Sequence, residues 1–441
     1  FVIVSNMGGG LMQLVAYGAQ DIYLTGNPQI TFWKVVYRRC TNFAIESVEQ
    51  TFMGNATPGS RATATISRNG DLVSNCVLEV DVTTRGGVTA AAAAAATNPV
   101  LAAGGMYNLV ESVEVEIGGQ KIDKHYGAWM EIWCELSCPH CGPKGDDSEQ
   151  VQSGKGKVVG HASTALTAFA YQAGTAQNKV SASNTFYVPL CFWFNRNPGL
   201  ALPLIALQYH EVKFNFQFSA LANIFSTTAT IFNSKADNAH DAATGEAACQ
   251  INSIKMFVDY IYLDTEERRR FAQQSHEYLI DQVQYTGAVS RTSGAAASQS
   301  LRLDFNHPCK ELVWVERNQT ASKGLCNFEA DMGKQGGSAL LQLNGHDRFA
   351  KRPMNYFTRV QPLQHHTNVP YGDRIGVYSF GLRPEDHQPS GTCNFSRIDN
   401  ATLQLTLADA AHADGSEFQV YATNYNVLRI MSGMGGLAYS N

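Results

Sequence analysis

The chain has 441 residues and a formal net charge of -5, with 44% hydrophobic and only 16% charged residues. A soluble domain carries roughly 25% charged residues, so this deficit predicts that much of the surface meets other protein rather than water. The composition excludes an intrinsically disordered chain, and a mildly acidic chain without a long Lys/Arg block is not expected to coat nucleic acid. The length fits about three ordinary domains or two large β domains.

The N-terminal residues do not resemble a targeting segment. Phe1 to Val4 is apolar but far too short for a signal peptide, and no run of about 18 apolar residues follows. Ten cysteines at mostly wide, uneven spacings do not form the framework of a disulfide-rich domain. We therefore expect a protein of reducing, cytosolic origin without a membrane span.

Short alternating strands are predicted through most of the chain. Asn69-Gly70 supplies the positive φ angles of a tight type I′ hairpin between the first two strands, and Gly118-Gly119 and Asn344-Gly345 mark later turns. Many short strands with such turns predict β-sandwiches or barrels. The expected strands are 62–66, 72–82, 113–117, 186–194, 212–218, 254–263, 301–305, 312–315, 340–343 and 403–407.

Three stretches between the strands are predicted to be long loops. Residues 90–96 are seven alanines, too few to nucleate a helix alone, and we expect an exposed loop there. Residues 137–183 are rich in Gly, Ala, Ser, Thr and Gln, and residues 233–246 are polar and alanine-rich. Long loops on a β scaffold are where recognition usually takes place.

A cluster of thiols lies near the start of the second of these loops. Cys134, Cys138, His140 and Cys141 fall within eight residues and are a candidate zinc site. Cys138 and Cys141 also form a C-x-x-C pair, but no thioredoxin-like context accompanies it. Free thiols or a local disulfide in a loop are the alternative that we favour.

One helix is predicted between two β-rich stretches. Asp264 is a candidate N-cap with Glu267 three residues later, and acidic residues suit the positive end of the helix dipole. The triplet Arg268-Arg269-Arg270 that follows is compatible with a nucleic-acid contact. A solvated helix face, or salt bridges to a neighbouring domain, is the interpretation that we favour.

No constellation points to catalysis. A nucleophile elbow, a P-loop and a dinucleotide fingerprint are all absent from the sequence, so we expect neither an enzyme nor a cofactor. The adjacent His365 and His366 would point to opposite faces of a strand, and no His-x-His pair suits a cupin-type metal site. We expect structural roles for His125, His210 and His276.

Sequons at Asn55, Asn318, Asn394 and Asn400 are candidate glycosylation sites, although such short motifs often arise by chance.

A pattern occurs twice along the chain. Each copy has a strand, a two-residue turn and a polar residue before aromatics, and a second pair of matching segments follows in the same order. Two copies of one β fold joined by a short helix explain this economically, and chance similarity between short hairpins is the alternative. The matching segments are 115–120 with 341–346, 192–194 with 378–380, and 212–216 with 401–405.

Several longer stretches resemble the major capsid proteins of nucleocytoplasmic large DNA viruses, most closely those of algal viruses (phycodnaviruses). The similarity is collinear, spans nearly the whole chain and is far more specific than any single motif above. The stretches that carry it are 14–33, 37–39, 41–43, 67–72, 117–120, 198–212, 389–402 and 426–439.

The resemblance implies an all-β double jelly roll, in which two eight-stranded antiparallel β-sandwiches are joined by a short linking helix and carry long surface loops. Three chains would form a homotrimer with a pseudo-hexagonal base, a capsomer that tiles the icosahedral shell of the virion. Neighbouring capsomers, minor capsid and penton proteins and an internal viral membrane would be its partners, with assembly in the host cytoplasm. The implied division is an N-terminal arm 1–32, a first jelly roll 33–264, a helical linker 265–277, a second jelly roll 278–430 and a C-terminal tail 431–441.

Assembly gives roles to the termini and loops. We predict that residues 8–31 run along the capsomer base against neighbouring subunits or minor proteins, and that residues 430–441 pack at an interface. Loops 86–106, 137–183 and 228–248 should face outward, where they would carry glycans or meet a host receptor. A rival interpretation is a secreted carbohydrate-binding or carbohydrate-active β-sandwich protein, against which the missing signal peptide and active-site pattern count. A viral receptor-binding spike is a third.

Overall fold

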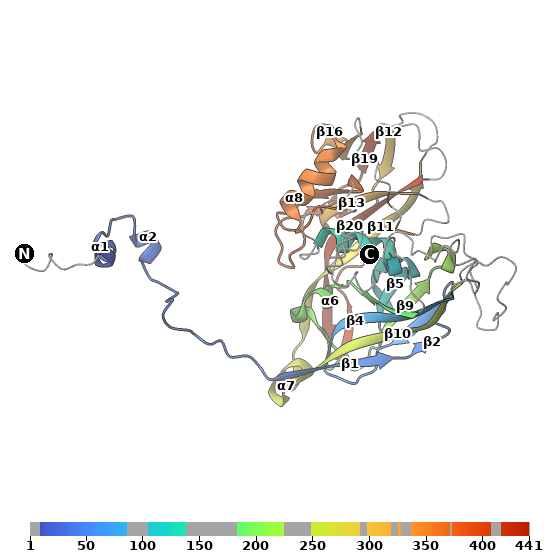
Figure 1. The fold of residues 1–441 in the computed structure, drawn as a ribbon, viewed down its shortest axis with the longest axis horizontal. Coiled ribbons are helices and arrows are strands. Elements are labelled where there is room, and N and C mark those ends of the chain that lie inside the picture. The colour runs from blue at the N-terminus through green and yellow to red at the C-terminus, as the bar shows by residue number, and fades with distance from the viewer. Residues whose placement is uncertain are drawn as a thin grey trace, which may run out of the picture. The chain divides into compact units, whose positions relative to one another are not determined.

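The computed structural model describes residues 9–85, 105–137, 183–224, 248–291, 298–318, 325–326, 328, 337–370, 373–406 and 416–440. The chain divides into two units, residues 1–42 and residues 43–441. Within the larger unit, antiparallel strands build two consecutive sandwiches with helix α7 (Thr265–Gln273) between them in the chain (Figure 1).

The smaller unit is an arm without a packed core among its described residues. It holds two short helices, α1 (Gly9–Val15) and α2 (Ile22–Thr25), and α2 buries none of its residues. Large apolar side chains along the arm are open to solvent, with Trp33 96% exposed. The arm therefore lacks the apolar burial that would hold it in one conformation by itself.

The first sandwich has two sheets around an apolar core. One sheet has the strand order β1-β10-β4-β7 with β8 on β4, and the other has the order β2-β3-β9-β5-β6. The alternation that predicts these strands is clearest in β9, where every second residue is buried. The strands are β1 (Phe43–Gln50), β2 (Phe52–Met53), β3 (Arg61–Thr65), β4 (Leu72–Arg85), β5 (Val110–Ile117), β6 (Gln120–Tyr126), β7 (Ser183–Pro189), β8 (Leu202–Pro203), β9 (Val212–Phe218) and β10 (Ala248–Leu263).

The second sandwich repeats the first strand for strand. Its sheets have the orders β11-β20-β13-β17 and β12-β19-β14-β15, so each of eight positions recurs in the same place. Both sandwiches are jelly rolls, and the predicted double jelly roll is confirmed. The strands are β11 (His276–Ser290), β12 (Ser298–Arg302), β13 (Pro308–Asn318), β14 (Ser338–Leu343), β15 (His346–Asp347), β16 (Arg352–Pro353), β17 (Ile375–Ser379), β18 (Cys393–Asn394), β19 (Ala401–Thr406), β20 (Ser416–Met431) and β21 (Met434–Leu437).

Short helical segments occupy equivalent connections in the two rolls. Helix α3 follows the sixth strand of the first roll, and η7 with α8 follows the sixth strand of the second. The sequence did not indicate α3, because nearly all residues of this helix are buried and it has no amphipathic period. The segments are η2 (Gly105–Leu109), α3 (Gly127–Ser137), α6 (Trp193–Arg196), η3 (Pro198–Leu200), η4 (Leu221–Asn223), η7 (Tyr356–Val360), α8 (Gln361–His365) and η9 (Phe395–Arg397).

Two local predictions were wrong. The strand expected over 186–194 ends at Pro189, and α6 begins at Trp193, since the chain leaves the sheet edge there. The hairpin expected at Asn69-Gly70 does not form, because β3 and β4 belong to different sheets. A Cβ on Gly70 would lie 2.8 Å from Cβ of Tyr260, so close packing rather than a tight turn requires glycine at this position.

Strand register gives the larger unit two distinct ends. Phe43 pairs with Leu263 and His276 with Ile430, so the first and last strands of both rolls meet at the end marked by α7. Arg85 pairs with Ala248 at the opposite end of the first roll. The described strands that flank the predicted outward loops all stop at that opposite end.

Candidate assembly surfaces

The apolar core of the first roll continues onto one sheet face of the second roll, whose own interior forms a separate apolar cluster. In β13, Leu312 and Trp314 face the interior of the second roll, whereas Val313 and Val315 face the other way and pack with residues of the first roll. As a result β20, in the middle of this sheet, is buried on both faces over most of its length. The second roll therefore presents one sheet face to its neighbour instead of to solvent.

Aromatic side chains from α3 and β6 fill this interface on the first roll's side. Trp129 lies 5.5 Å from Tyr421, measured between ring centroids, and Tyr126 lies 4.9 Å from Tyr285. Trp129 is only 2% exposed. Each buried aromatic removes 150–250 Å² from water in typical proteins, so this contact fixes the rolls as one body.

Ion pairs and a hydrogen bond also join the two rolls at this interface. Arg196, which follows the seventh strand of the first roll, lies 3.6 Å from a carboxylate oxygen of Asp281 on β11. Lys310 of the second roll lies 3.4 Å from the same carboxylate, and burial lowers the pKa of Lys310 although Asp281 opposes the shift. The backbone N–H of Val283 donates to Oδ1 of Asp123 at 3.1 Å. In the Arg196–Asp281 pair the cation comes from the first roll's connection and the anion from the second roll's sheet.

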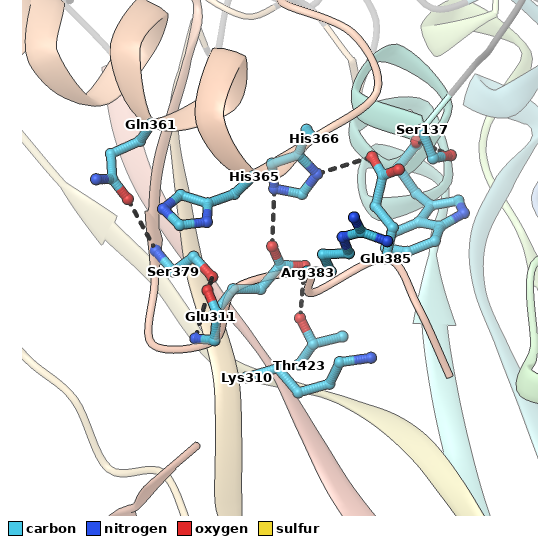
Figure 2. Close-up of polar contacts among 12 residues, drawn as sticks. Ser137, Lys310, Glu311, Gln361, His365, His366, Ser379, Arg383, Glu385 and Thr423 are labelled. Atoms are coloured by element: carbon cyan, nitrogen blue, oxygen red, sulfur yellow. Dashed lines mark hydrogen bonds and ion pairs between the residues drawn. The ribbon is translucent and has the colours of Figure 1, made fainter. Parts of the chain in front are cut away.

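A cluster of ionisable side chains lies where the sheet β11-β20-β13-β17 meets the end of α3 (Figure 2). His366 is held between two carboxylates, with Nε2 2.9 Å from Glu311 and Nδ1 2.9 Å from Glu385. The Thr423 hydroxyl donates to the other oxygen of Glu311 at 2.8 Å. Two residues further on, Asn368 donates to the backbone carbonyls of Glu135 and Leu136 at the end of α3. His366 therefore anchors a segment that bridges the two rolls.

The charges in this cluster stabilise one another. Burial lowers the pKa of His366, but the two carboxylates outweigh it and raise the pKa to about 9. Burial raises the pKa of Glu311, but His366 and Thr423 outweigh it and hold that pKa below its usual range. We expect a protonated His366 beside an ionised Glu311 near neutral pH. His365 ends α8 and His366 follows it, so neither lies in a strand.

The segment predicted as a C-terminal tail forms a hairpin. β21 pairs with β20, and from there the chain contacts the first roll. His210 Nδ1 lies 3.0 Å from the Gly435 carbonyl, and the Leu437 N–H donates to Oε1 of Gln120. Beside this contact, side chains at the end marked by α7 remain exposed, among them Tyr209 and Met434.

The predicted metal and redox cluster is only partly described. Cys134 lies in α3, with Sγ 3.5 Å from the Tyr107 hydroxyl. Cys138, His140 and Cys141 lie outside the described residues. Within the described ranges, no group of three or more histidine, cysteine or carboxylate side chains is placed to hold a metal ion. The candidate zinc site stays a prediction.

The four sequons lie in different settings. Asn55, Asn394 and Asn400 are exposed, and Asn318 ends β13. The Asn394 side chain already accepts the Ser396 N–H at 3.0 Å, as a cap of η9. Glycosylation at these positions stays a prediction.

Helix α7 is tied to the first roll by Arg268. Arg268 donates through Nε and Nη2 to Oδ1 of Asp71, each at 2.8 Å, and Asp71 also accepts the Leu263 N–H. Asp264 caps the helix by accepting the Thr265 N–H. This pair is a salt bridge between the helix and a roll, as the sequence suggested. No helix in the described part of the chain is long and apolar enough to cross a bilayer.

The chain is similar to known proteins in both sequence and fold. A family model described as "Major capsid protein N-terminus" matches residues 31–264, and one described as "Large eukaryotic DNA virus major capsid protein" matches residues 267–436. The major capsid protein of Pyramimonas orientalis virus is 48% identical over 457 residues, covering 99% of this chain and all of that protein. That of Paramecium bursaria Chlorella virus 1 is 44% identical over 485 residues with the same coverage.

Solved structures of viral capsid proteins have the same fold as this chain. The crystal structure of VP54 from PBCV-1 superimposes with a TM-score of 0.72 at 38% identity, covering 93% of this chain and 100% of that one. The Faustovirus major capsid protein, at 13% identity, has the same fold with a TM-score of 0.65 over 96% of both chains.

Paired jelly rolls with this topology define the class of double jelly roll viral capsid proteins. The chain belongs to the family of major capsid proteins of large eukaryotic DNA viruses, and members from phycodnaviruses are among its relatives. It is a structural protein of the virion capsid. The rival interpretation as a secreted carbohydrate-binding or carbohydrate-active protein is not favoured.

Proposed function

We propose that three copies of this chain form a pseudo-hexagonal capsomer and that such capsomers tile an icosahedral shell. The observation that carries this proposal is the strand-for-strand repeat of one roll within the chain, fixed by a buried interface. Each chain then supplies two similar walls, and three chains supply six. We propose a purely structural role, without catalysis.

The chain divides, in this proposal, into the arm 1–32, rolls at 33–264 and 278–430, a linker at 265–277 and a tail from 431. Helix α7 lies in the proposed linker, and the two family models meet between residues 264 and 267. The hairpin of β20 with β21 supports an interface role for the tail, since it already contacts the first roll.

The two ends of the larger unit suggest an orientation in the shell. We propose that the end marked by α7 is the base, near the minor capsid and penton proteins and an internal membrane. Loops 86–106, 137–183 and 228–248 would then face outward, toward glycans or a host receptor. Their described flanking strands stop at the end opposite α7, which supports this assignment. Assembly in the host cytoplasm completes the proposal.

The native mass of the purified chain tests the trimer. Light scattering should give about 144 kDa, three times the 48.1 kDa of one chain. A stable monomer under assembly conditions would contradict the proposal.

Deletion of residues 8–27 tests the arm: trimers should still form, while incorporation into particles should fall. Unchanged incorporation would remove the arm from assembly.

A further inference from the structure

The buried contact within one chain joins two unlike surfaces. The first roll contributes the connection after its sixth strand, with α3, and the connection after its seventh strand, with Arg196. The second roll contributes the outward face of the sheet β11-β20-β13-β17. Both rolls have the same topology. The first roll therefore also has an outward sheet face, and the second roll also has helical connections equivalent to those that carry α3 and Arg196.

The counterpart on the first roll is the outward face of the sheet β1-β10-β4-β7. Across β4 and β10, buried residues alternate with partly exposed ones, and the outward side chains pair in register, Val77 beside Phe257 and Glu79 beside Lys255. Tyr187 of β7 lies next to Glu79 and is 37% exposed. We call these residues the open sheet face. In the second roll the corresponding face is buried.

The counterpart on the second roll is the connection that holds η7, α8 and the segment after β17 (Figure 1). Its apolar side chains are open: Leu363 is 72% exposed and Leu382 is 74% exposed. Val360, one helical turn before Leu363, is also exposed, and a hydrogen bond of His365 to the Leu382 carbonyl holds the two segments together. We call Val360, Leu363, Leu382 and the adjacent Arg383 the α8 patch.

The charges of these two surfaces are also complementary. The open sheet face is mainly acidic, with outward Glu79, Asp81 and Asp259 and one outward lysine, Lys255. The α8 patch ends in Arg383, whose side chain is 78% exposed and lies 3.8 Å from the carboxylate of Asp386. Within the chain, Arg196 of the first roll likewise approaches Asp281 of the opposing sheet, where Lys310 of that sheet also contacts the carboxylate. Such complementarity favours one partner and one orientation.

We propose that the α8 patch of one copy docks on the open sheet face of a second copy, repeating between chains the contact that joins the rolls within a chain. The proposal rests on the proposed trimer and names its contact surfaces. A contact between two unlike surfaces is heterologous and closes into a ring when the rotation per copy allows it. Six similar rolls joined by six similar contacts would close after three chains.

Two single variants test the two surfaces separately. Leu382→Asp places a carboxylate in the α8 patch, and Phe257→Asp places one in the open sheet face. Each variant should shift the protein from trimer to monomer in light scattering. Met53→Asp is the matched control, since Met53 is similarly exposed on β2, outside both surfaces, and should stay trimeric. Thermal unfolding confirms that each variant is folded.

Mixing the two monomeric variants gives the sharpest result. The Leu382→Asp chain keeps an intact sheet face, and the Phe257→Asp chain keeps an intact α8 patch, so one good contact can form between them. The mixture should yield a heterodimer of about 96 kDa, twice 48.1 kDa, which cannot grow because both its ends are damaged.

The outcomes separate this inference from the proposed function. If the wild-type chain is not a trimer, the proposed function fails. If the wild type is a trimer and either variant retains it, the inference is overturned while the trimer stands. Monomeric variants that give no heterodimer on mixing would also overturn it, because a contact between unlike surfaces requires complementation.

Discussion

The two jelly rolls share a strand order but use equivalent sheets differently. In the first roll the sheet β1-β10-β4-β7 faces its own core on one side only, and β10 alternates between buried and partly exposed residues over 254–260. In the second roll the sheet β11-β20-β13-β17 is covered on both sides, and β20 is buried almost continuously. Strands in equivalent positions thus have different burial patterns. A strand alternates between buried and exposed residues where its sheet is covered on one face, and is buried continuously where the sheet is covered on both.

The outward side chains differ accordingly. The open sheet of the first roll carries charged residues such as Glu79 and Asp259, whereas the covered sheet of the second roll carries Val313, Val315 and Tyr421. Where charges do occur on the covered sheet, as at Glu311, they are paired. Burial of an unpaired charge is costly, so each buried charge needs a partner.

The largest expected effect comes from truncating an aromatic side chain at the buried interface between the rolls. Trp129→Ala should lower the free energy of unfolding by about 4 kcal/mol, because it removes a buried aromatic and leaves a cavity. Phe257→Ala on the equivalent open sheet should cost about 1 kcal/mol or less, measured in the Leu382→Asp background that we expect to be monomeric. Urea unfolding followed by circular dichroism checks both. Equal losses would show that the two sheets are not covered differently.

The next largest effect concerns the charged cluster on the covered sheet. His366→Leu should lower the free energy of unfolding by about 3 kcal/mol, because buried Glu311 then loses the cation in direct contact with it. Arg429→Met is the control, since it breaks a half-exposed pair with Glu277 and should cost less than about 1 kcal/mol. The double variant His366→Leu with Glu311→Leu should recover part of the loss. A double variant as unstable as the sum of both singles would argue against the pairing.

A smaller effect is expected from pH. The pKa of His366 is raised from 6.5 to about 9 in the folded chain, so its contribution is complete below about pH 6.5 and is lost as pH rises through about 9. The loss should amount to about 1–3 kcal/mol. Glu311 acts in the opposite sense, since its lowered pKa gives a contribution that disappears as the solution is acidified below about pH 4.5. Urea midpoints between pH 6 and 10 should fall in the wild type and stay flatter in His366→Leu.

The elements that local chemistry determines could be predicted from the sequence. The strand expected over 212–218 matches β9 in full, because its alternation reports one buried face. Gly118-Gly119 and Asn344-Gly345 form the predicted turns, with positive φ angles at all four residues. Asn69-Gly70 has the same chemistry but joins two different sheets, which no local signal reveals.

The contacts between the rolls could not be predicted in the same way. His366, Glu311 and Glu385 are far apart in the chain and meet only when the segment after α8 folds over β13. Helix α3 is buried on nearly every side, so its sequence lacks the polar face that identifies a surface helix. Tertiary packing decides both features.

The length of two central strands has a mechanical consequence. β10 and β20 have 16 residues each, about 50 Å when extended, and each is hydrogen-bonded to a strand on both sides. In antiparallel sheets these bonds lie perpendicular to the strands. A load along the strands therefore shears many bonds at once, whereas a load across the sheet peels them apart in sequence. Each wall should be stiff along its strands and compliant sideways.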